Sequence, residues 1–187
     1  SFDERAYLLR NTATILRDQR AFYAELMAYE MGKPLVQGEA ESEKCAWVCE
    51  FYADKAEQFL TTESVSADTV ASRVTFEPLG VVLAVMPWNF PFWQVFRFAA
   101  PALMAGNTAI LKHASNVSGC ALEIENVFQQ AGLPDGAFKT VLVPGSRVGE
   151  IIEDKRIRAV TLTGSTPAGK SVASKAGGAL KKTVLEL

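Results

Sequence analysis

The spacing of apolar residues changes partway along the chain. Through residues 1–60 apolar side chains recur every three or four positions, which is the period of an amphipathic helix. Gly32 and Pro34 interrupt this pattern in the way that helices commonly end. We therefore predict two helices within residues 1–31 and a third over residues 36–60. The third helix carries acidic residues in its first turns, where its dipole is expected to stabilise them: Glu39, Glu41 and Glu43.

From residue 74 onward, short apolar runs alternate with helical segments. Residues 61–73 are polar and rich in serine and threonine, which indicates a linker or a bend. We expect strands at residues 74–77, 81–86, 108–111, 138–143, 159–163 and 183–187, and helices at residues 92–104, 118–131, 148–153 and from 167 onward. This alternation favours an α/β fold with a doubly wound, Rossmann-like parallel sheet. We divide the chain into a helical N-terminal segment, residues 1–73, and a dinucleotide-binding domain, residues 74–187.

The most apolar stretch, residues 80–111, contains a single charged residue, Arg97. A membrane span is the alternative explanation, but Pro87, Pro91, Asn89 and Gln94 interrupt the stretch, and no uninterrupted apolar run reaches the roughly 20 residues that a bilayer requires. Strands buried on both faces of a parallel sheet explain the hydrophobicity as well. We predict a βαβ unit with Trp88 and Asn89 beyond the carboxyl end of its first strand, where ligands bind to open parallel sheets.

Composition narrows the classes of function. The 187 residues are 49% hydrophobic and 21% charged with a net charge of −2, which is typical of a globular protein and unlike proteins that bind nucleic acid or an anionic membrane. Charges spread through residues 1–20 are unlike a signal peptide. Cys45, Cys49 and Cys120 lack metal-ligand spacing beside the only histidine, so we expect reduced thiols in the cytoplasm and no metal site.

Two segments indicate a phosphate-bearing ligand. The segment G-S-T-P-A-G, residues 164–169, follows a predicted strand and opens a predicted helix, with Thr166 as the expected cap and Pro167 at the first helical position. Exposed N–H groups at such a helix start suit a phosphate, although the segment matches neither the G-x-G-x-x-G pattern nor a P-loop. Lys112 and Ser115 follow a neighbouring strand, so we expect them at the same edge of the sheet.

Two further polar residues stand in apolar surroundings. The side-chain amide of Asn89 can donate a hydrogen bond to a developing oxyanion. Glu186 lies in an apolar run, where burial would raise the pKa of its carboxyl toward that of a general base. A strand-edge glutamate that faces solvent is the alternative for Glu186. His113 has no visible acidic or nucleophilic partner.

Several motifs in a fixed order resemble the aldehyde dehydrogenase superfamily over nearly the whole chain. They are E-x-G-K-P at residues 30–34, P-L-G-V-V at 78–82, P-W-N-F-P at 87–91, A-L-M-A-G-N-T-A-I-L-K at 102–112, A-G-L-P-D-G-A-F at 131–138, V-T-L-T-G-S-T-P-A-G at 160–169 and L-E-L at 185–187. The segment L-K-H-A-S-N at 111–116 is most similar to bacterial succinate-semialdehyde dehydrogenases. The resemblance implies an oxidoreductase that oxidises an aldehyde, here succinate semialdehyde, to its carboxylate with NADP or NAD.

The resemblance also implies roles for individual residues. In this family a cysteine thiolate attacks the aldehyde, hydride passes to the nicotinamide, and the resulting thioester is hydrolysed. Asn89 matches the amide that stabilises the oxyanion, and Glu186 matches the carboxylate that activates water. The residues that match cofactor contacts are Met86, Pro87, Trp88, Asn89, Lys112, His113, Ala114, Ser115, Gly149, Thr163, Gly164, Ser165 and Leu187.

Ser115 bears on the choice of cofactor. Many NAD-dependent relatives carry a glutamate here that holds the ribose hydroxyls. A short neutral hydroxyl beside Lys112 removes repulsion against a 2′-phosphate and can bond to it. We therefore expect NADP to be preferred, with NAD as the alternative.

One component of the family's chemistry is missing from this sequence. The family's nucleophilic cysteine lies a few dozen residues beyond the L-E-L motif, and none of the three cysteines matches its position. We expect the catalytic domain to lie outside these residues, and the 187-residue chain alone to bind cofactor weakly without turning over aldehyde. As in the family, we expect a homo-oligomer. The alternative is a non-catalytic nucleotide-binding or oligomerisation module of enzyme ancestry.

Overall fold

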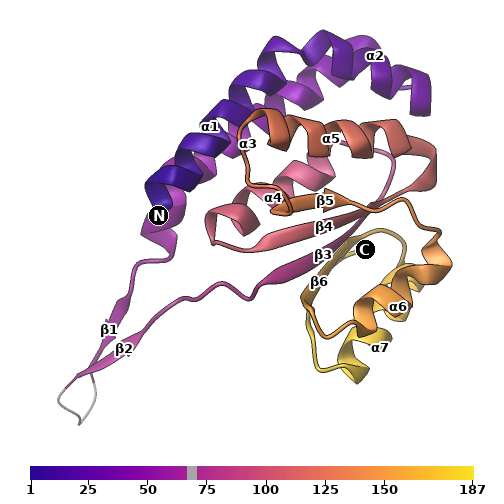
Figure 1. Cartoon of the computed structure of the whole chain (residues 1–187). Helices are drawn as coiled ribbons and strands as arrows, with labels where there is room; N and C mark the ends of the chain where they lie inside the picture. The colour runs from indigo at the N-terminus through magenta and orange to yellow at the C-terminus, as the bar shows by residue number, and fades with distance from the viewer. Residues whose placement is uncertain (67–70) are drawn as a thin grey trace.

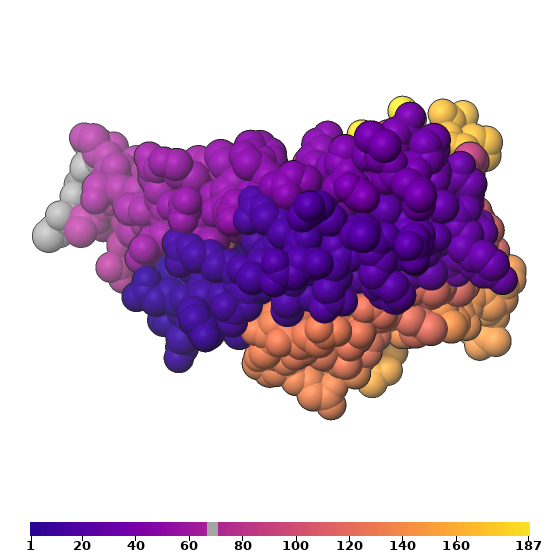
Figure 2. Space-filling model, turned by 90° about the horizontal axis from the view of Figure 1, so that it is seen from above, coloured from indigo at the N-terminus to yellow at the C-terminus, as the bar shows by residue number. Residues whose placement is uncertain are grey.

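The computed structural model describes residues 1–66 and 71–187 (Figure 1). Its N-terminal part consists of helices α1 (Phe2–Asp18), α2 (Arg20–Met31) and α3 (Leu35–Phe59), as the apolar period predicts. Gly32 ends α2 in the left-handed conformation, with φ of 73°, which glycine adopts without a steric penalty. Seen from above, these helices cover much of one face of the molecule (Figure 2).

Five parallel strands form the central sheet, in the order β5-β4-β3-β6-β7. They are β3 (Val81–Met86), β4 (Thr108–His113), β5 (Phe138–Thr140), β6 (Ile157–Thr163) and β7 (Lys182–Glu186). The chain runs outward from β3 to β5 and returns to the other side of β3 at β6, so the prediction of a doubly wound sheet is confirmed. β4 extends two residues further than expected, which puts Lys112 and His113 inside the strand rather than after it.

Helices cover both faces of the sheet and enclose two hydrophobic cores (Figure 1). They are α4 (Trp93–Met104), α5 (Ser118–Gln130), α6 (Val148–Glu153) and α7 (Thr166–Gly178), with short 3-10 helices η1 (Ser115–Val117) and η2 (Gly145–Arg147) before α5 and α6. The larger core lies between the sheet, α4, α5 and the N-terminal helices, and contains Phe92, Phe96 and Phe128. The smaller core lies under α6 and α7 around Leu83 and Val160.

A two-stranded antiparallel hairpin extends from the body of the molecule (Figure 1). Its strands, β1 (Glu63–Val65) and β2 (Ser72–Val74), replace the linker expected at residues 61–73 and the strand expected at 74–77, so both predictions are wrong for the described residues. Residues 67–70 of that linker lie outside the described part of the chain. Strands of three residues are too short for an alternating pattern to be recognised. The predicted boundary after residue 73 falls within this hairpin.

The apolar stretch at residues 80–111 forms the predicted βαβ unit. β3 and β4 are adjacent parallel strands, and α4 connects them. Among the described residues, no helix has both the length and the apolar character needed to cross a bilayer.

Candidate functional site

The carboxyl ends of four parallel strands meet at one edge of the sheet. Met86 at the end of β3 pairs with His113 of β4, and Thr163 at the end of β6 pairs with Glu186 of β7. The candidate residues that follow these strands are Pro87, Trp88, Asn89, Ala114, Ser115, Gly164, Ser165 and Leu187. The structure therefore brings most of the candidates to a single edge, as their positions after strands predict.

Successive side chains of a strand point to opposite faces of the sheet, so these candidates are divided between two hollows. Lys112, in register with Val85, lies on the face that α6 and α7 cover, and lines a hollow there. Thr163 and Glu186 lie on the opposite face and line a cavity beside α4. We call these the α6–α7 hollow and the α4–β7 cavity. The candidates thus belong to two sites on opposite faces of the sheet.

The α6–α7 hollow has a volume of about 400 Å³ and a lining suited to an anion. Its polar and glycine lining consists of Lys112, Gly145, Ser146, Gly149, Ser171 and Lys175. Lys112 is only 9% exposed, and its amine has no hydrogen bond or ion pair with any described residue. Burial lowers the pKa of this amine. Because a buried ammonium without a counter-ion is costly, the residues of this hollow fit an anionic group of a ligand.

The start of α7 differs by one residue from the prediction. Ser165 is the cap, since its Oγ accepts a hydrogen bond from the N–H of Ala168 at 3.4 Å. Thr166 is the first residue of the helix, so its prediction as the cap is wrong, and Pro167 takes the second helical position. Both positions lack an intrahelical acceptor for their N–H, so proline is tolerated equally well there. A Cβ at Gly169 would overlap the side chain of Leu187, so glycine allows α7 to approach the end of β7 closely.

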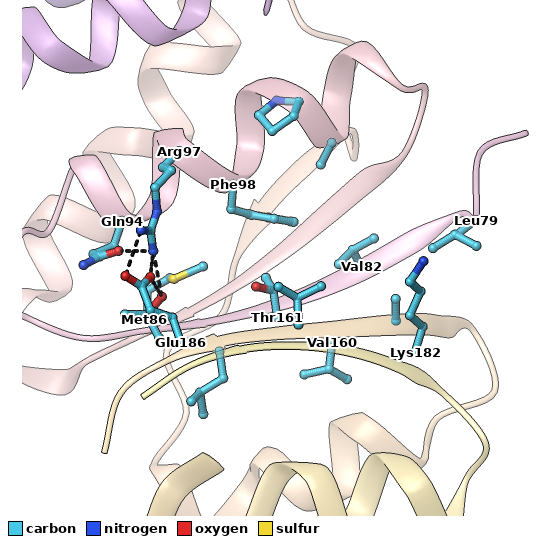
Figure 3. A pocket seen from close by; sticks show the side chains of 16 residues that line it. Leu79, Val82, Met86, Gln94, Arg97, Phe98, Val160, Thr161, Lys182 and Glu186 are labelled. Atoms are coloured by element: carbon cyan, nitrogen blue, oxygen red, sulfur yellow. Dashed lines mark hydrogen bonds and ion pairs between the residues drawn. The ribbon is translucent and has the colours of Figure 1, made fainter. Parts of the chain in front are cut away.

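The α4–β7 cavity holds Glu186 in an ion pair rather than in a buried apolar site (Figure 3). Arg97 Nη1 donates to Glu186 Oε1 at 2.9 Å, and Thr163 Oγ1 donates to Oε2 at 3.2 Å. Arg97 Nη2 also donates to Gln94 Oε1 at 2.7 Å. The Glu186 side chain is 53% exposed, so the expected burial is wrong and the strand-edge alternative is confirmed. Among the described residues β7 is an edge strand of the sheet, which leaves this side chain open to solvent.

The turn that carries Asn89 is held at Pro91, but Asn89 itself is exposed and has no hydrogen-bond partner among the described residues. His113 is buried, and its Nδ1 accepts from the N–H of Ala114 at 2.9 Å, so Nε2 carries the proton and donates to Pro91 O at 2.9 Å. Burial lowers the pKa of His113. Both ring nitrogens therefore serve the fold. Asn89 does not line the α4–β7 cavity and shares only the sheet edge with Glu186.

Two carboxylates of the N-terminal helices hold the starts of α4 and α5. The sequence did not predict this role for either of them. Glu41 Oε1 accepts from the N–H groups of Phe92 and Trp93, each at 2.9 Å. Glu30 accepts from the N–H groups of Gly119 and Cys120 at 2.7 and 2.8 Å. The expected role of Glu41 in its own helix dipole is wrong, because it is buried against another helix. Its place one turn before Cys45, on the apolar stripe of α3, was the available signal.

None of the three cysteines is placed to act as a nucleophile. Cys45, Cys49 and Cys120 are free thiols with no exposed surface. Burial raises the pKa of each thiol. They are therefore core residues.

A doubly wound parallel sheet with an anion-suited hollow beside the ends of its strands is the architecture typical of nucleotide-binding α/β proteins. The model of the aldehyde dehydrogenase family matches residues 1–187, and the chain belongs to this family.

Individual relatives are similar over the whole chain. The chain is 60% identical over 186 residues to a probable succinate-semialdehyde dehydrogenase [NADP(+)] from Synechocystis sp., and 52% identical over 190 residues to a succinate-semialdehyde dehydrogenase [NADP(+)] from Mycobacterium avium. These matches cover 100% of this chain and 41% and 40% of the relatives. Succinic semialdehyde dehydrogenase from Streptococcus pyogenes, solved in complex with NADP+, superposes with a TM-score of 0.97 at 40% identity, covering 100% of this chain and 41% of that one. The chain therefore spans about two fifths of the length of its relatives.

Proposed function

We propose that the chain is the cofactor-binding part of an NADP-dependent dehydrogenase that oxidises succinate semialdehyde to its carboxylate. The observation that carries this proposal is Lys112, a buried cation in the α6–α7 hollow that has no counter-ion among the described residues. A dinucleotide supplies anionic groups for such a site. The names of the Synechocystis and Streptococcus relatives support the same cofactor.

Lys112 and Ser115 account for a preference for NADP over NAD. Both belong to the end of β4 and the turn after it, and Ser115 is exposed. A lysine amine and a neutral hydroxyl can both donate to a 2′-phosphate, whereas a glutamate in place of Ser115 would repel it. The remaining predicted contacts, including Gly149, Gly164 and Ser165, form part of this proposal.

The chemistry assigned to this chain consists of charge stabilisation and proton transfer. The bound cofactor supplies the hydride acceptor. The amide of Asn89 would donate to the oxyanion that forms on the aldehyde. The carboxylate of Glu186 would accept a proton from the water that hydrolyses the acyl group. Because Cys45, Cys49 and Cys120 are buried, we propose that the nucleophilic cysteine and the rest of the catalytic domain are supplied by residues outside this sequence.

The α4–β7 cavity supports a carboxylate-bearing aldehyde. Arg97 and Lys182 both line it, and Arg97 lies beside the proposed base Glu186 (Figure 3). A guanidinium binds a carboxylate with two parallel hydrogen bonds, which suits the carboxylate end of succinate semialdehyde. Nη1 and Nη2 of Arg97 already donate to Glu186 and Gln94, so the N–H groups of Arg97 that these bonds leave over would serve the substrate. We therefore assign recognition of that carboxylate to Arg97.

For the full-length protein we propose a cytoplasmic homo-oligomer. The hairpin of β1 and β2 supports this, because it extends from the body with unpaired strand edges that another subunit could cover. Light scattering of the purified protein measures the oligomeric state, and a monomer at micromolar concentration would contradict it.

Calorimetric titration of NADP and NAD into the chain tests the assignment of cofactor. We expect NADP to bind more tightly than NAD, and Lys112→Met to remove the difference. Lys170→Met is the matched control, since it removes one exposed lysine of α7 that does not line the hollow. Equal binding of both cofactors, or an NADP preference that survives Lys112→Met, would overturn the proposal and favour a module of another function.

A further inference from the structure

The segment between α2 and α3 reaches the turn that carries Asn89 through a buried ion pair. Lys33 and Glu41 form this pair, with 5% and 2% of their side chains exposed. Glu41 Oε1 accepts from the N–H groups of Phe92 and Trp93, the groups at the start of α4. Phe92 provides no side-chain cap for α4, so Glu41 supplies the missing acceptor from another helix.

Lys33 also contacts this turn directly, in addition to its link through Glu41. Its amine lies 4.0 Å from the centre of the Phe90 ring, a cation–π contact with the residue that directly follows Asn89. On the other side, Nε2 of His113 donates to Pro91 O at 2.9 Å. The chain on the C-terminal side of Asn89 is therefore held at consecutive residues, at the ring of Phe90 and at the main chain of residues 91–93.

Asn89 depends on these anchors for its own position. It makes no hydrogen bond with any described residue, so only the main chain around it sets the direction of its amide. An oxyanion donor must be held within a few tenths of an ångström of its productive position to be effective. A turn held directly after Asn89 by contacts from both α3 and β4 meets this need, whereas a solvated asparagine on a free loop does not.

We propose that Glu41, paired with Lys33, is a positioning residue that fixes the amide of Asn89 for the oxidation of aldehyde. The inference rests on the proposed function, which makes Asn89 the oxyanion donor. An ion pair this deeply buried gains little stability over an apolar pair of similar volume, because desolvation offsets the attraction. What the ion pair adds is a carboxylate oxygen that accepts hydrogen bonds from the N–H groups of Phe92 and Trp93. An apolar pair has no such acceptor.

The test uses the full-length enzyme and separates positioning from stability. Glu41→Ala removes the acceptor for both N–H groups, and we expect kcat to fall about 10- to 100-fold while KM for NADP changes less than about twofold. Lys33→Met combined with Glu41→Gln retains an oxygen acceptor without the charges, and we expect it to restore kcat to within about threefold of wild type. If Glu41→Ala does not fold, Lys33→Met with Glu41→Leu replaces it, because this neutral pair removes the acceptor without leaving a buried charge.

Glu125 provides a matched control. Its Oε2 accepts from the N–H of Thr140 at 2.6 Å and its Oε1 from Lys139 at 3.0 Å, so it also joins a lysine to a main-chain donor, but at β5. We expect Glu125→Ala to lower thermal stability with kcat unchanged within about twofold. A comparable loss of kcat in Glu125→Ala would overturn the positioning role, because general loosening of the fold would then explain both variants.

Asn89→Ala separates this inference from the proposed function. We expect it to lower kcat about 10²- to 10³-fold, and Glu41→Ala to cause no further loss in the Asn89→Ala background. An unchanged kcat in Asn89→Ala would refute the oxyanion role and the inference together. A large effect of Asn89→Ala with no effect of Glu41→Ala, or with losses that multiply in the double variant, would refute the inference alone.

Discussion

The guanidinium of Arg97 and the carboxylate of Glu186 join α4 to the end of β7, with Nη1 donating to Oε1 at 2.9 Å across 89 residues of sequence. Both side chains are more than one third exposed, so the pair adds little to the stability of the fold. It matters for the site, because it holds Glu186 in the α4–β7 cavity. Thr163, which also lines this cavity, is the second partner of Glu186 and accepts a hydrogen bond from Arg97.

Replacing Glu186 with glutamine keeps the shape of the side chain and removes the proposed proton acceptor. In the full-length enzyme we expect steady-state turnover to fall about 10²-fold or more, since general-base catalysis contributes this much. A first burst of about one NADPH per active site should survive, because oxidation precedes hydrolysis. Rapid-mixing absorbance measures both quantities.

Glu43→Gln is the control for this variant, because Glu43 is an equally exposed glutamate paired with an arginine, Arg17, but lies on α3 away from both hollows. It should leave both the burst and the steady state unchanged. Normal turnover by Glu186→Gln, or loss of the burst with the steady state, would contradict the assigned role.

Arg97→Leu tests recognition of the substrate carboxylate. We expect KM for succinate semialdehyde to rise about tenfold or more, the value of a charge-assisted hydrogen bond, and KM for butanal to change less than about threefold. Lys182→Leu, which removes the other cation of the cavity, is the comparison and should have the smaller effect. An equal rise in KM for the charged and the neutral aldehyde would show that Arg97 stabilises the fold and does not bind the substrate carboxylate.

Lys112→Met should weaken cofactor binding and stabilise the protein at the same time. Burial lowers the pKa of Lys112 from its ordinary value of 10.5, so the folded state binds the proton less tightly than the unfolded state does. The unfavourable contribution is therefore fully present below the lowered pKa and disappears as pH rises from there to 10.5. We expect a higher Tm at pH 7 and NADP binding weakened about 10- to 100-fold.

Differential scanning calorimetry and titration calorimetry measure the two effects on Lys112→Met. Lys170→Met, on the exposed side of α7, should change neither. A lower Tm with unchanged NADP binding would show that Lys112 has a structural partner and no ligand.

Periodicity predicted the elements whose pattern is long. The helices of residues 1–60 and the strands of the parallel sheet follow from local spacing alone, and the rule that ligands bind at the carboxyl ends of strands then brings Asn89, Ser115 and Ser165 to one edge. The short strands β1 and β2 were not predictable in this way. They have three residues each and are stabilised by pairing with each other.

The environment of single residues depended on the order of the strands. Glu186 was expected to be buried because its neighbours in sequence are apolar, but β7 lies at the edge of the sheet and the side chain meets Arg97 instead. Glu41 was expected to serve its own helix, but it contacts Phe92, 51 residues away. Such long-range partners are set by tertiary packing, which local patterns do not encode.

The three cysteines should be unreactive in the folded chain. Cys45, Cys49 and Cys120 have no exposed surface, and burial raises the pKa of each thiol, so almost no reactive thiolate is present at pH 7. We expect a thiol-specific chromogenic reagent to label none of them within minutes in buffer and all three in guanidinium chloride. Rapid labelling of one cysteine in buffer would contradict this and make that residue a candidate nucleophile.

His113 offers the sharpest test of the turn beside Asn89, because it is the only histidine in the chain. Its Nδ1 accepts from Ala114 and its Nε2 donates to Pro91, so nitrogen-15 NMR should show one neutral imidazole with the proton on Nε2. Burial lowers its pKa below 6.5, so the unfolded state takes up the proton first as pH falls. The stability due to neutral His113 is thus complete above about pH 6.5 and is lost on acidification through the lowered pKa. Thermal unfolding between pH 7.5 and 5 should show this decline, and His113→Gln should lack it. A ring that titrates near pH 6.5 in the folded chain, or that carries its proton on Nδ1, would show that the turn is not held by this contact.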